Sequence, residues 1–142
     1  MVPTVAKQMI REYIYAYSAL SPQTGDCYSI ISPFCNTEAM NEFVKLVSAN
    51  YPYRIIMILH KAGWHLSQKM QLPENIKLLH LNPYSPEHNP VELLWREIRR
   101  KYFHNNIFET LNAVKETLQK ALCAYHQSKE EVRSLSKGFL PF

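Results

Sequence analysis

The chain has 142 residues, enough for one hydrophobic core and too few for a multidomain enzyme, so residues 1–142 are expected to form a single domain. The composition is 46% hydrophobic and 20% charged. No apolar run is long enough to cross a bilayer, and no charged-then-apolar leader is present, so we expect a cytoplasmic protein with no membrane association. The formal net charge of +4 is compatible with an anionic partner but does not establish one.

A hairpin and a helix are predicted first along the chain. Residues alternate in polarity from Arg11 to Ala19, break at a turn, and resume from Cys27 to Ser32, which is typical of two antiparallel strands. Asn36 or Thr37 can then cap a helix that ends near Asn50. The three cysteines lack CxxC spacing, which argues against a disulfide framework or a zinc–thiolate site.

Two strands and a loop are predicted next. The apolar run within Tyr53 to Leu59 is rich in β-branched residues, which predicts a central strand covered on both faces. Ile76 to Leu81 predicts a further short strand, and the prolines of the following segment indicate a loop. In such α/β proteins the strand from Tyr53 runs parallel to a partner, and ligands bind at the carboxyl ends of strands, here at His60.

The last third of the chain predicts helices. Asn89 suits an N-cap and Pro90 the first helical position, and an apolar stripe follows at Val91, Leu94, Trp95, Ile98 and Tyr102. Another helix is expected from about Glu109. Ser128 and Glu131 have the spacing of a capping box for a last short helix.

One stretch carries a family resemblance: Leu81-Asn82-Pro83-Tyr84-Ser85-Pro86-Glu87-His88-Asn89-Pro90-Val91-Glu92, followed by Leu94-Trp95-Arg96-Glu97-Ile98-Arg99-Arg100. It closely resembles the third catalytic block of mariner-like insertion-sequence transposases, which are DDE-type endonucleases. The sequence departs from that family's pattern at Asn82, where proline is usual, and at His88, where an apolar residue is common. The resemblance extends over nearly the whole chain. It implies a ribonuclease-H/retroviral-integrase-like mixed sheet flanked by helices, and DNA as the partner.

The resemblance also implies a metal centre. In that family three carboxylates hold two Mg²⁺ or Mn²⁺ ions, which activate the attacking oxygen and stabilise the leaving oxygen of a phosphodiester. Glu92 matches the third acid. The second acid should be an aspartate at the end of the buried strand, where this chain has His60 or, one residue on, Lys61. Asp26 cannot replace an acid, because it lies in the turn of the hairpin.

The first acid precedes the hairpin in that family, and we expect this chain to begin after it, so the first strand is expected to be missing. A single carboxylate rarely holds Mg²⁺, and a neutral imidazole adds no anionic charge. The hypothesis is therefore a degenerate or truncated transposase fragment that does not cut DNA alone. Its binding of Mg²⁺ or Mn²⁺ is doubtful, and whether it is an enzyme stays open.

Other interpretations remain beside this one. Glu92 is the third helical residue after Asn89, where a glutamate stabilises a helix start without any catalytic role. The basic residues that follow can contact phosphates or form a solvated face: Arg96, Arg99, Arg100 and Lys101. The histidines are read as packing residues rather than zinc ligands, and Tyr13, Tyr15 and Tyr17 as packing rather than base-stacking residues.

Two further expectations concern partners. Without a first strand, two sheet edges would be exposed, and we expect them to pair directly, to be filled by residues Met1 to Ile10, or to associate two chains as a homodimer. The alternative function is a non-catalytic nucleic-acid-binding or transposase-interacting module, which steeply salt-dependent DNA affinity without metal would favour. A folded remnant without a selected role is the third hypothesis.

Overall fold

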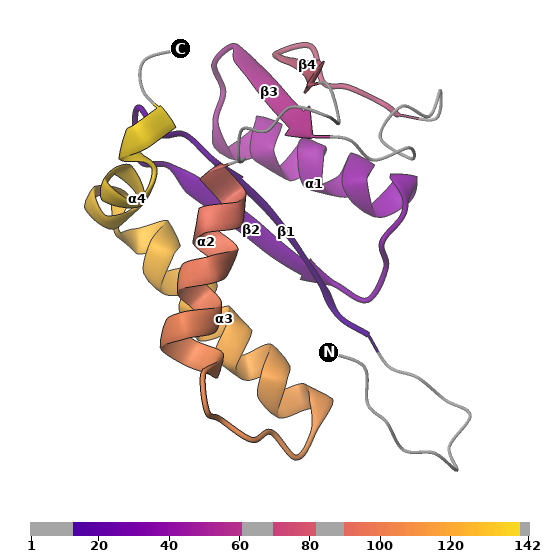
Figure 1. Cartoon of the computed structure of the whole chain (residues 1–142). Coiled ribbons are helices and arrows are strands. Elements are labelled where there is room, and N and C mark those ends of the chain that lie inside the picture. Colours follow the sequence, from indigo (N-terminus) through magenta and orange to yellow (C-terminus); the bar gives the residue numbers. More distant parts are fainter. Residues whose placement is uncertain (1–12, 61–69, 82–89, 140–142) are drawn as a thin grey trace. The chain divides into compact units, whose positions relative to one another are not determined.

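The computed structural model describes residues 13–60, 70–81 and 90–139 (Figure 1). The chain divides into two compact units, formed by residues 1–34 with 90–142 and by residues 35–89. Strands and helices occur in both units, which confirms a mixed α/β protein. The first unit carries one antiparallel hairpin and the last three helices, and the second carries one helix and two parallel strands.

The predicted hairpin of the first unit forms, but its first strand begins at Tyr15 and ends at Leu20, whereas the sequence predicts it from Arg11 to Ala19. Strands β1 (Tyr15–Leu20) and β2 (Cys27–Ser32) are antiparallel, with Ala16 opposite Ile31 and Leu20 opposite Cys27. Because side chains alternate along a strand, these four residues share one face. All four pack in or against the hydrophobic core of the unit, so the alternation decides which face the helices cover.

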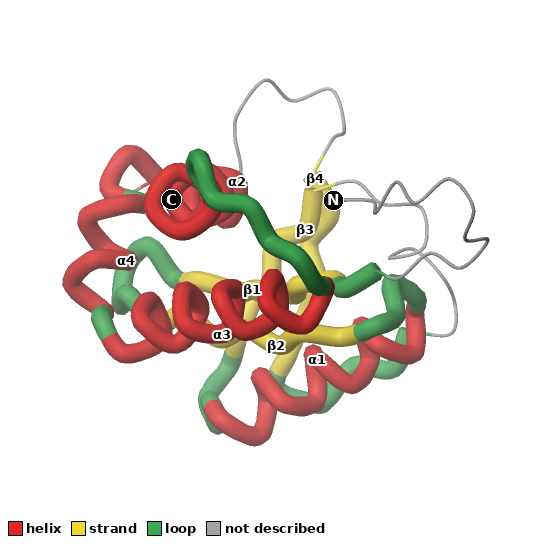
Figure 2. Tube along the Cα trace, turned by 90° about the horizontal axis from the view of Figure 1, so that it is seen from below, coloured by secondary structure: helices red, strands yellow, loops and turns green. Residues whose placement is uncertain are grey.

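Three helices pack around this hairpin. Helix α2 (Pro90–Ile98) contacts β1, and helix α3 (Leu111–Gln127) contacts β2. These elements are labelled in Figure 2. Helix α4 (Lys129–Leu135) contacts both helices. A π-helical turn, η2 (Arg99–Phe103), continues α2, and a 3₁₀ turn, η3 (Lys137–Phe139), follows α4.

Local capping sets these boundaries. Helix α2 begins at Pro90 as predicted, but its expected cap Asn89 lies outside the described residues. Helix α3 begins two residues after Glu109, because the Thr110 hydroxyl accepts a hydrogen bond from the amide of Ala113 at 3.0 Å. The Ser128 hydroxyl likewise accepts from the amide of Glu131 at 3.3 Å, which confirms the predicted cap of the last helix.

The core of the first unit is built mainly from the three helices. Its buried residues are Cys27, Leu94, Ile98, Ala121, Leu122, Tyr125 and Val132. Leu94 and Ile98 come from the apolar stripe predicted for α2, and Ala121, Leu122 and Tyr125 from that predicted for α3. Val132 is added from α4 and Cys27 from the hairpin. Burial raises the pKa of the Cys27 thiol to about 11, because the thiolate is disfavoured away from water, so this cysteine is a packing residue and not a nucleophile.

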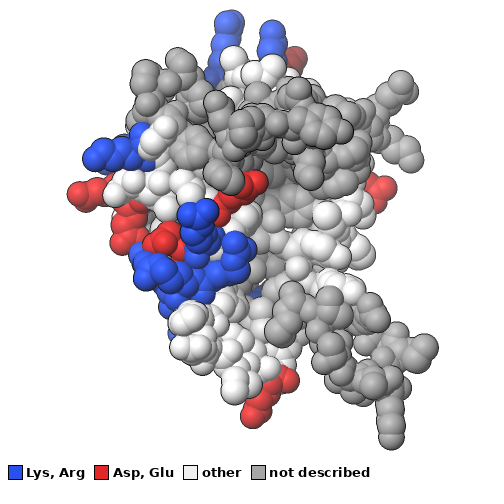
Figure 3. Space-filling model, in the orientation of Figure 1, with Lys and Arg blue, Asp and Glu red and all other residues white. Residues whose placement is uncertain are grey.

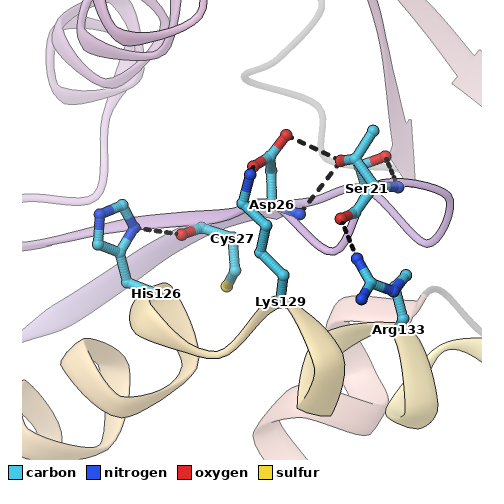
Figure 4. A network of polar contacts seen from close by, with 7 residues as sticks. Ser21, Asp26, Cys27, His126, Lys129 and Arg133 are labelled. Atoms are coloured by element: carbon cyan, nitrogen blue, oxygen red, sulfur yellow. Dashed lines mark hydrogen bonds and ion pairs between the residues drawn. The ribbon is translucent and has the colours of Figure 1, made fainter.

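Polar contacts tie the hairpin turn to α4 and the end of α3 (Figure 4). The ammonium of Lys129 lies 3.1 Å from a carboxylate oxygen of Asp26, and the guanidinium of Arg133 donates to the carbonyl of Thr24 at 2.8 Å. The ring Nδ1 of His126 lies 2.7 Å from the carbonyl of Cys27, to which it must donate. Asp26 is thus a structural residue of the turn, as the sequence predicts.

The second unit contains helix α1 (Thr37–Asn50) and strands β3 (Ile55–His60) and β4 (Ile76–Leu81). Asn36 caps α1, as predicted, by accepting a hydrogen bond from the amide of Ala39 at 2.8 Å. The side chain of Asn75 donates to the carbonyls of Tyr51 and Tyr53, which fixes the chain between α1 and β3. The helical stripe is buried at Met40, Phe43, Val44 and Val47.

Strand β3 differs from its prediction in one respect. It pairs in parallel with β4, as predicted, but β4 is its only neighbour among the described residues, so β3 is not central in this part of the chain. Its faces also differ: Met57 is 8% exposed, whereas Ile56 is 69% exposed. The sequence predicts cover on both faces, whereas within the described residues only the face of Met57 is buried, because a continuous apolar run does not say which side receives cover. The expected filling by Met1 to Ile10 lies outside the described residues.

Candidate functional site

Helix α2 presents a row of charged side chains to solvent. Leu94 and Ile98 anchor the helix in the core with 0% and 2% exposure. Residues one helical turn apart share a face, so the exposed side chains of Glu92 and Arg96 lie on the same outer flank of α2. Figure 3 shows Lys and Arg side chains gathered over this helix, with carboxylates beside them. The structure therefore brings the predicted acid and the first predicted basic residue together.

The π-helical turn η2 carries the rest of the basic residues. Arg99, Arg100 and Lys101 are exposed, while Tyr102 and Phe103 pack against the core. A π-helical turn inserts an extra residue into the helix, and such turns are rare and frequent at functional sites. Here three consecutive cations remain outside while the two aromatic rings that follow reach the core. We call Arg96, Arg99, Arg100 and Lys101 the basic surface.

Within the basic surface, Arg100 is paired with a carboxylate. Its Nη2 lies 2.8 Å and its Nε 3.2 Å from the two carboxylate oxygens of Glu97, a bidentate arrangement. The hydrogen bond from Arg100 lowers the pKa of Glu97 and raises that of Arg100, so the pair stays ionised around neutral pH. The sequence analysis did not identify this pairing, although the i,i+3 spacing of Glu97 and Arg100 is its signal.

Lys101 has an aromatic partner. Its ammonium lies 5.8 Å from the ring centroid of Tyr125, within reach of a cation–π interaction. Glu97 and Lys101 border a cavity of about 180 Å³, whose other lining residues are Tyr125, Glu131, Ser134 and Leu135. Burial raises the pKa of Tyr125, whose hydroxyl has no hydrogen-bond partner among the described residues. Lys101 is thus held against α3 rather than extended into solvent.

Arg96 and Arg99 differ from their two neighbours. In the described parts of the chain, neither guanidinium makes a hydrogen bond, an ion pair or a ring contact. Arg96 only contributes, at a distance, to lowering the pKa of Glu97. The basic surface therefore has two guanidinium groups with their donors available and two cations already engaged.

The other predicted site residue, His60, ends β3. Its position at the carboxyl end of that strand agrees with the prediction. His60 is also paired in register with Leu81, so the carboxyl ends of the parallel strands β3 and β4 meet there. Its side chain, Lys61 and the loop of residues 82–89 lie outside what the structure describes. Glu92 belongs to the other compact unit, and the closeness of His60 and Glu92 stays a prediction.

The acidic donors of the described residues do not gather. Within residues 13–60, 70–81 and 90–139, no three His, Cys, Asp or Glu side chains lie where they could hold one metal ion. Glu92 offers one exposed carboxylate, and Asp26 is paired with Lys129. The acids of the described residues therefore do not fit a two-metal centre built on three carboxylates.

The remaining observations concern the aromatic residues and the search for membrane spans. Tyr17 is 8% exposed, and its hydroxyl donates to the carbonyl of Phe34 at 2.9 Å, so it is a packing residue. The rings of Tyr13 and Tyr15 stack on each other with centroids 6.2 Å apart. Trp95 packs against the core, and Trp64 lies outside the described residues. None of the described helices is both long and apolar enough to span a membrane.

Comparisons with known proteins agree with the resemblance seen in the sequence. A family model described as DDE superfamily endonuclease matches residues 3–115. The protein named "Uncharacterized protein y4pE/y4sA" from Sinorhizobium fredii is 37% identical over 99 residues, which cover 68% of this chain and 73% of that protein. No solved structure matches the chain. The match of the family model over most of the sequence shows that this chain belongs to the DDE superfamily of endonucleases.

Proposed function

We propose that the chain is the nuclease domain of a mariner-like transposase of ribonuclease-H-like fold, and that it holds DNA through the basic surface without cutting it alone. Membership of the DDE endonuclease superfamily supports a protein that acts on DNA. The transposase subclass rests on the resemblance of the loop and helix that contain Asn82, Pro90 and Glu92.

The main support for DNA binding is that the guanidinium groups of Arg96 and Arg99 have their donors available. Each sits on a helix anchored in the core, so little of the backbone must be ordered when a ligand binds. A guanidinium group presents planar donors that match phosphate oxygens, and contacts of this kind dominate the affinity of proteins for the DNA backbone. Glu92 shares the flank of Arg96, which would place the single matched acid beside the bound backbone.

The proposal that the chain does not cut DNA alone depends on the lack of a carboxylate at the position of the family's second acid. The resemblance places His60 or, one residue on, Lys61 where the family has an aspartate, and neither an imidazole nor an ammonium supplies the negative charge that a carboxylate gives to Mg²⁺ or Mn²⁺. The described acids do not compensate, since Glu92 is the one acid matched to the motif and Asp26 serves the hairpin turn. The available arginines support DNA binding, and the set of acids argues against cleavage. Together they favour a non-catalytic DNA-binding module.

Salt-dependent binding tests this function. We expect duplex DNA binding, measured by fluorescence anisotropy between 50 and 200 mM salt, to weaken steeply with salt. Arg96→Ala and Arg99→Ala should each reduce the slope of log K against log salt by about 0.9, the value for one phosphate contact. Each phosphate contact changes affinity by about three- to fourfold over that salt range.

Arg54→Ala is the matched control, because Arg54 is exposed and lies just before β3, at the end of that strand opposite to His60. It removes the same charge from a position outside the basic surface. Equal losses in all three variants would mean that net charge alone attracts the DNA. No measurable binding by the unaltered chain at 50 mM salt would refute the proposed function.

A further inference from the structure

The strongest unexplained feature of the basic surface is that its cations are not equally available. Arg100 is engaged bidentately by Glu97, with distances of 2.8 and 3.2 Å, and Lys101 lies over the Tyr125 ring. Arg96 lies one helical turn before Arg100, and Arg99 directly precedes it. Neither contacts a carboxylate or an aromatic ring among the described residues. A basic surface evolved only to hold phosphates would not be expected to place a carboxylate in the fork of one of its arginines.

The geometry of the Glu97–Arg100 pair resembles that of an arginine on a phosphate. Two parallel N–H···O bonds from one guanidinium to two anionic oxygens are what Arg forms with phosphate as well as with carboxylate. The Glu97 oxygens thus occupy the Nε–Nη2 edge of Arg100, one of the two edges that a DNA phosphate can use, and the carboxylate charge repels a phosphate that approaches the other edge. Arg100 cannot serve both anions through the same edge, so the two must compete for it.

The pair is placed where such competition can occur. The Arg100 side chain is 62% exposed and that of Glu97 is 27% exposed, so the bridge lies at the surface beside Arg99. Exposed ion pairs contribute little net stability because water and salt screen them. A polyanion that also binds the neighbouring arginines therefore gains enough binding free energy to displace the carboxylate in a minority of complexes. A small anion that contacts Arg100 alone does not gain enough to break the ion pair.

We propose that Glu97 acts as an internal competitor of the DNA backbone, which holds Arg100 away from phosphates and keeps the affinity of this surface for DNA low. The inference rests on the proposed DNA binding and adds the element that regulates it. In this account Arg96 and Arg99 make the first contacts with phosphates. In the unaltered chain the Glu97 carboxylate keeps Arg100 in most complexes, and Arg100 becomes a full phosphate ligand only when that carboxylate is displaced or removed.

A double-mutant cycle at Glu97 and Arg100 tests this proposal by DNA anisotropy over a range of salt. Glu97→Ala should tighten binding about three- to tenfold at 50 mM salt and steepen the salt slope by about 0.9, because one phosphate contact is added. Glu97→Gln keeps the size of the side chain but weakens the acceptor, so its affinity for DNA should lie between those of the unaltered chain and Glu97→Ala. Arg100→Ala alone should change affinity less than about twofold, since its fork is already filled.

The double variant gives the decisive comparison. With Arg100→Ala present, Glu97→Ala should no longer tighten binding. Glu109→Ala is the matched charge control, because Glu109 is exposed and lies between η2 and α3, and it should leave the salt slope unchanged. Circular dichroism of all variants verifies that the overall helix content is retained.

The outcomes separate this inference from the proposed function. A gain in Glu97→Ala that persists without Arg100 would overturn the competitor role, since removal of any negative charge would then suffice. An unchanged affinity in Glu97→Ala, in a chain whose binding depends on Arg96 and Arg99, would overturn it while leaving the proposed function intact. A chain that binds no DNA in any of these variants would remove both.

Discussion

Gly25→Ala is expected to lower the free energy of unfolding by about 2–5 kcal/mol, combining left-handed backbone strain with overpacking. Gly25 lies in the turn between β1 and β2 with φ of +83°, a region that residues with a Cβ atom rarely adopt. A Cβ atom placed on it would lie 2.3 Å from the carbonyl oxygen of Lys129, and this oxygen belongs to the backbone at the start of α4. The backbone there cannot yield as a flexible side chain would.

The same turn is held by the ion pair of Asp26 with Lys129 and by the hydrogen bond from Arg133 to Thr24. A displaced Gly25 would therefore strain these contacts as well. Urea unfolding followed by circular dichroism measures the effect. Gly138→Ala is the matched control, because a Cβ atom at Gly138 would meet nothing within 4 Å, and its effect should stay within about 0.5 kcal/mol. Equal destabilisation by the two substitutions would contradict the close approach of the turn to α4.

Leu94→Ala is expected to destabilise the protein by about 3–5 kcal/mol, the upper part of the range for Leu→Ala in cores. Leu94 is 0% exposed and lies at the centre of the core formed by α2, α3 and α4. Removing its side chain leaves a cavity that neighbouring helices can fill only in part. Because Leu94 also anchors the helix that carries Glu92 and Arg96, the loss of stability would be accompanied by weaker DNA binding.

Ile107→Ala provides the comparison for Leu94→Ala, since Ile107 is 95% exposed and buries almost no area. Its effect on the free energy of unfolding should stay within about 0.5 kcal/mol. Denaturant unfolding of both variants, with m-values compared, separates the core effect from changes in the unfolded state. A loss below about 1 kcal/mol in Leu94→Ala would show that α2 is not anchored as described.

Much of the local structure could be predicted because it depends on neighbouring residues. The caps at Asn36 and Ser128 and the alternation of β1 and β2 are signals a few residues long, and the structure agrees with each. The element order predicted a parallel partner for the strand from Tyr53 without saying which strand it is, and the structure shows that this partner is β4. Glu92 and the basic residues were found on the predicted helix because the apolar stripe of that helix is regular.

Features that depend on contacts distant in sequence could not be predicted. The exposure of Ile56 depends on which faces of β3 receive cover, and an apolar run does not contain that information. The close approach of Gly25 to Lys129 joins residues separated by more than a hundred positions. The π-helical turn at Arg99–Phe103 arises because Tyr102 and Phe103 pack against the core, and no rule of helical periodicity indicates it.

Metal-dependent nicking of supercoiled plasmid by the purified chain, with Mn²⁺ and with Mg²⁺, tests the central claim most directly. We predict that the chain binds the plasmid but nicks it no faster than Glu92→Gln does, because the proposed function places His60 or Lys61 where the family has its second acid. Within the described residues, no three donor side chains lie where they could hold a metal ion. An active DDE endonuclease assayed in parallel shows that the conditions support cleavage. Clear nicking by the unaltered chain that disappears in Glu92→Gln would contradict this account.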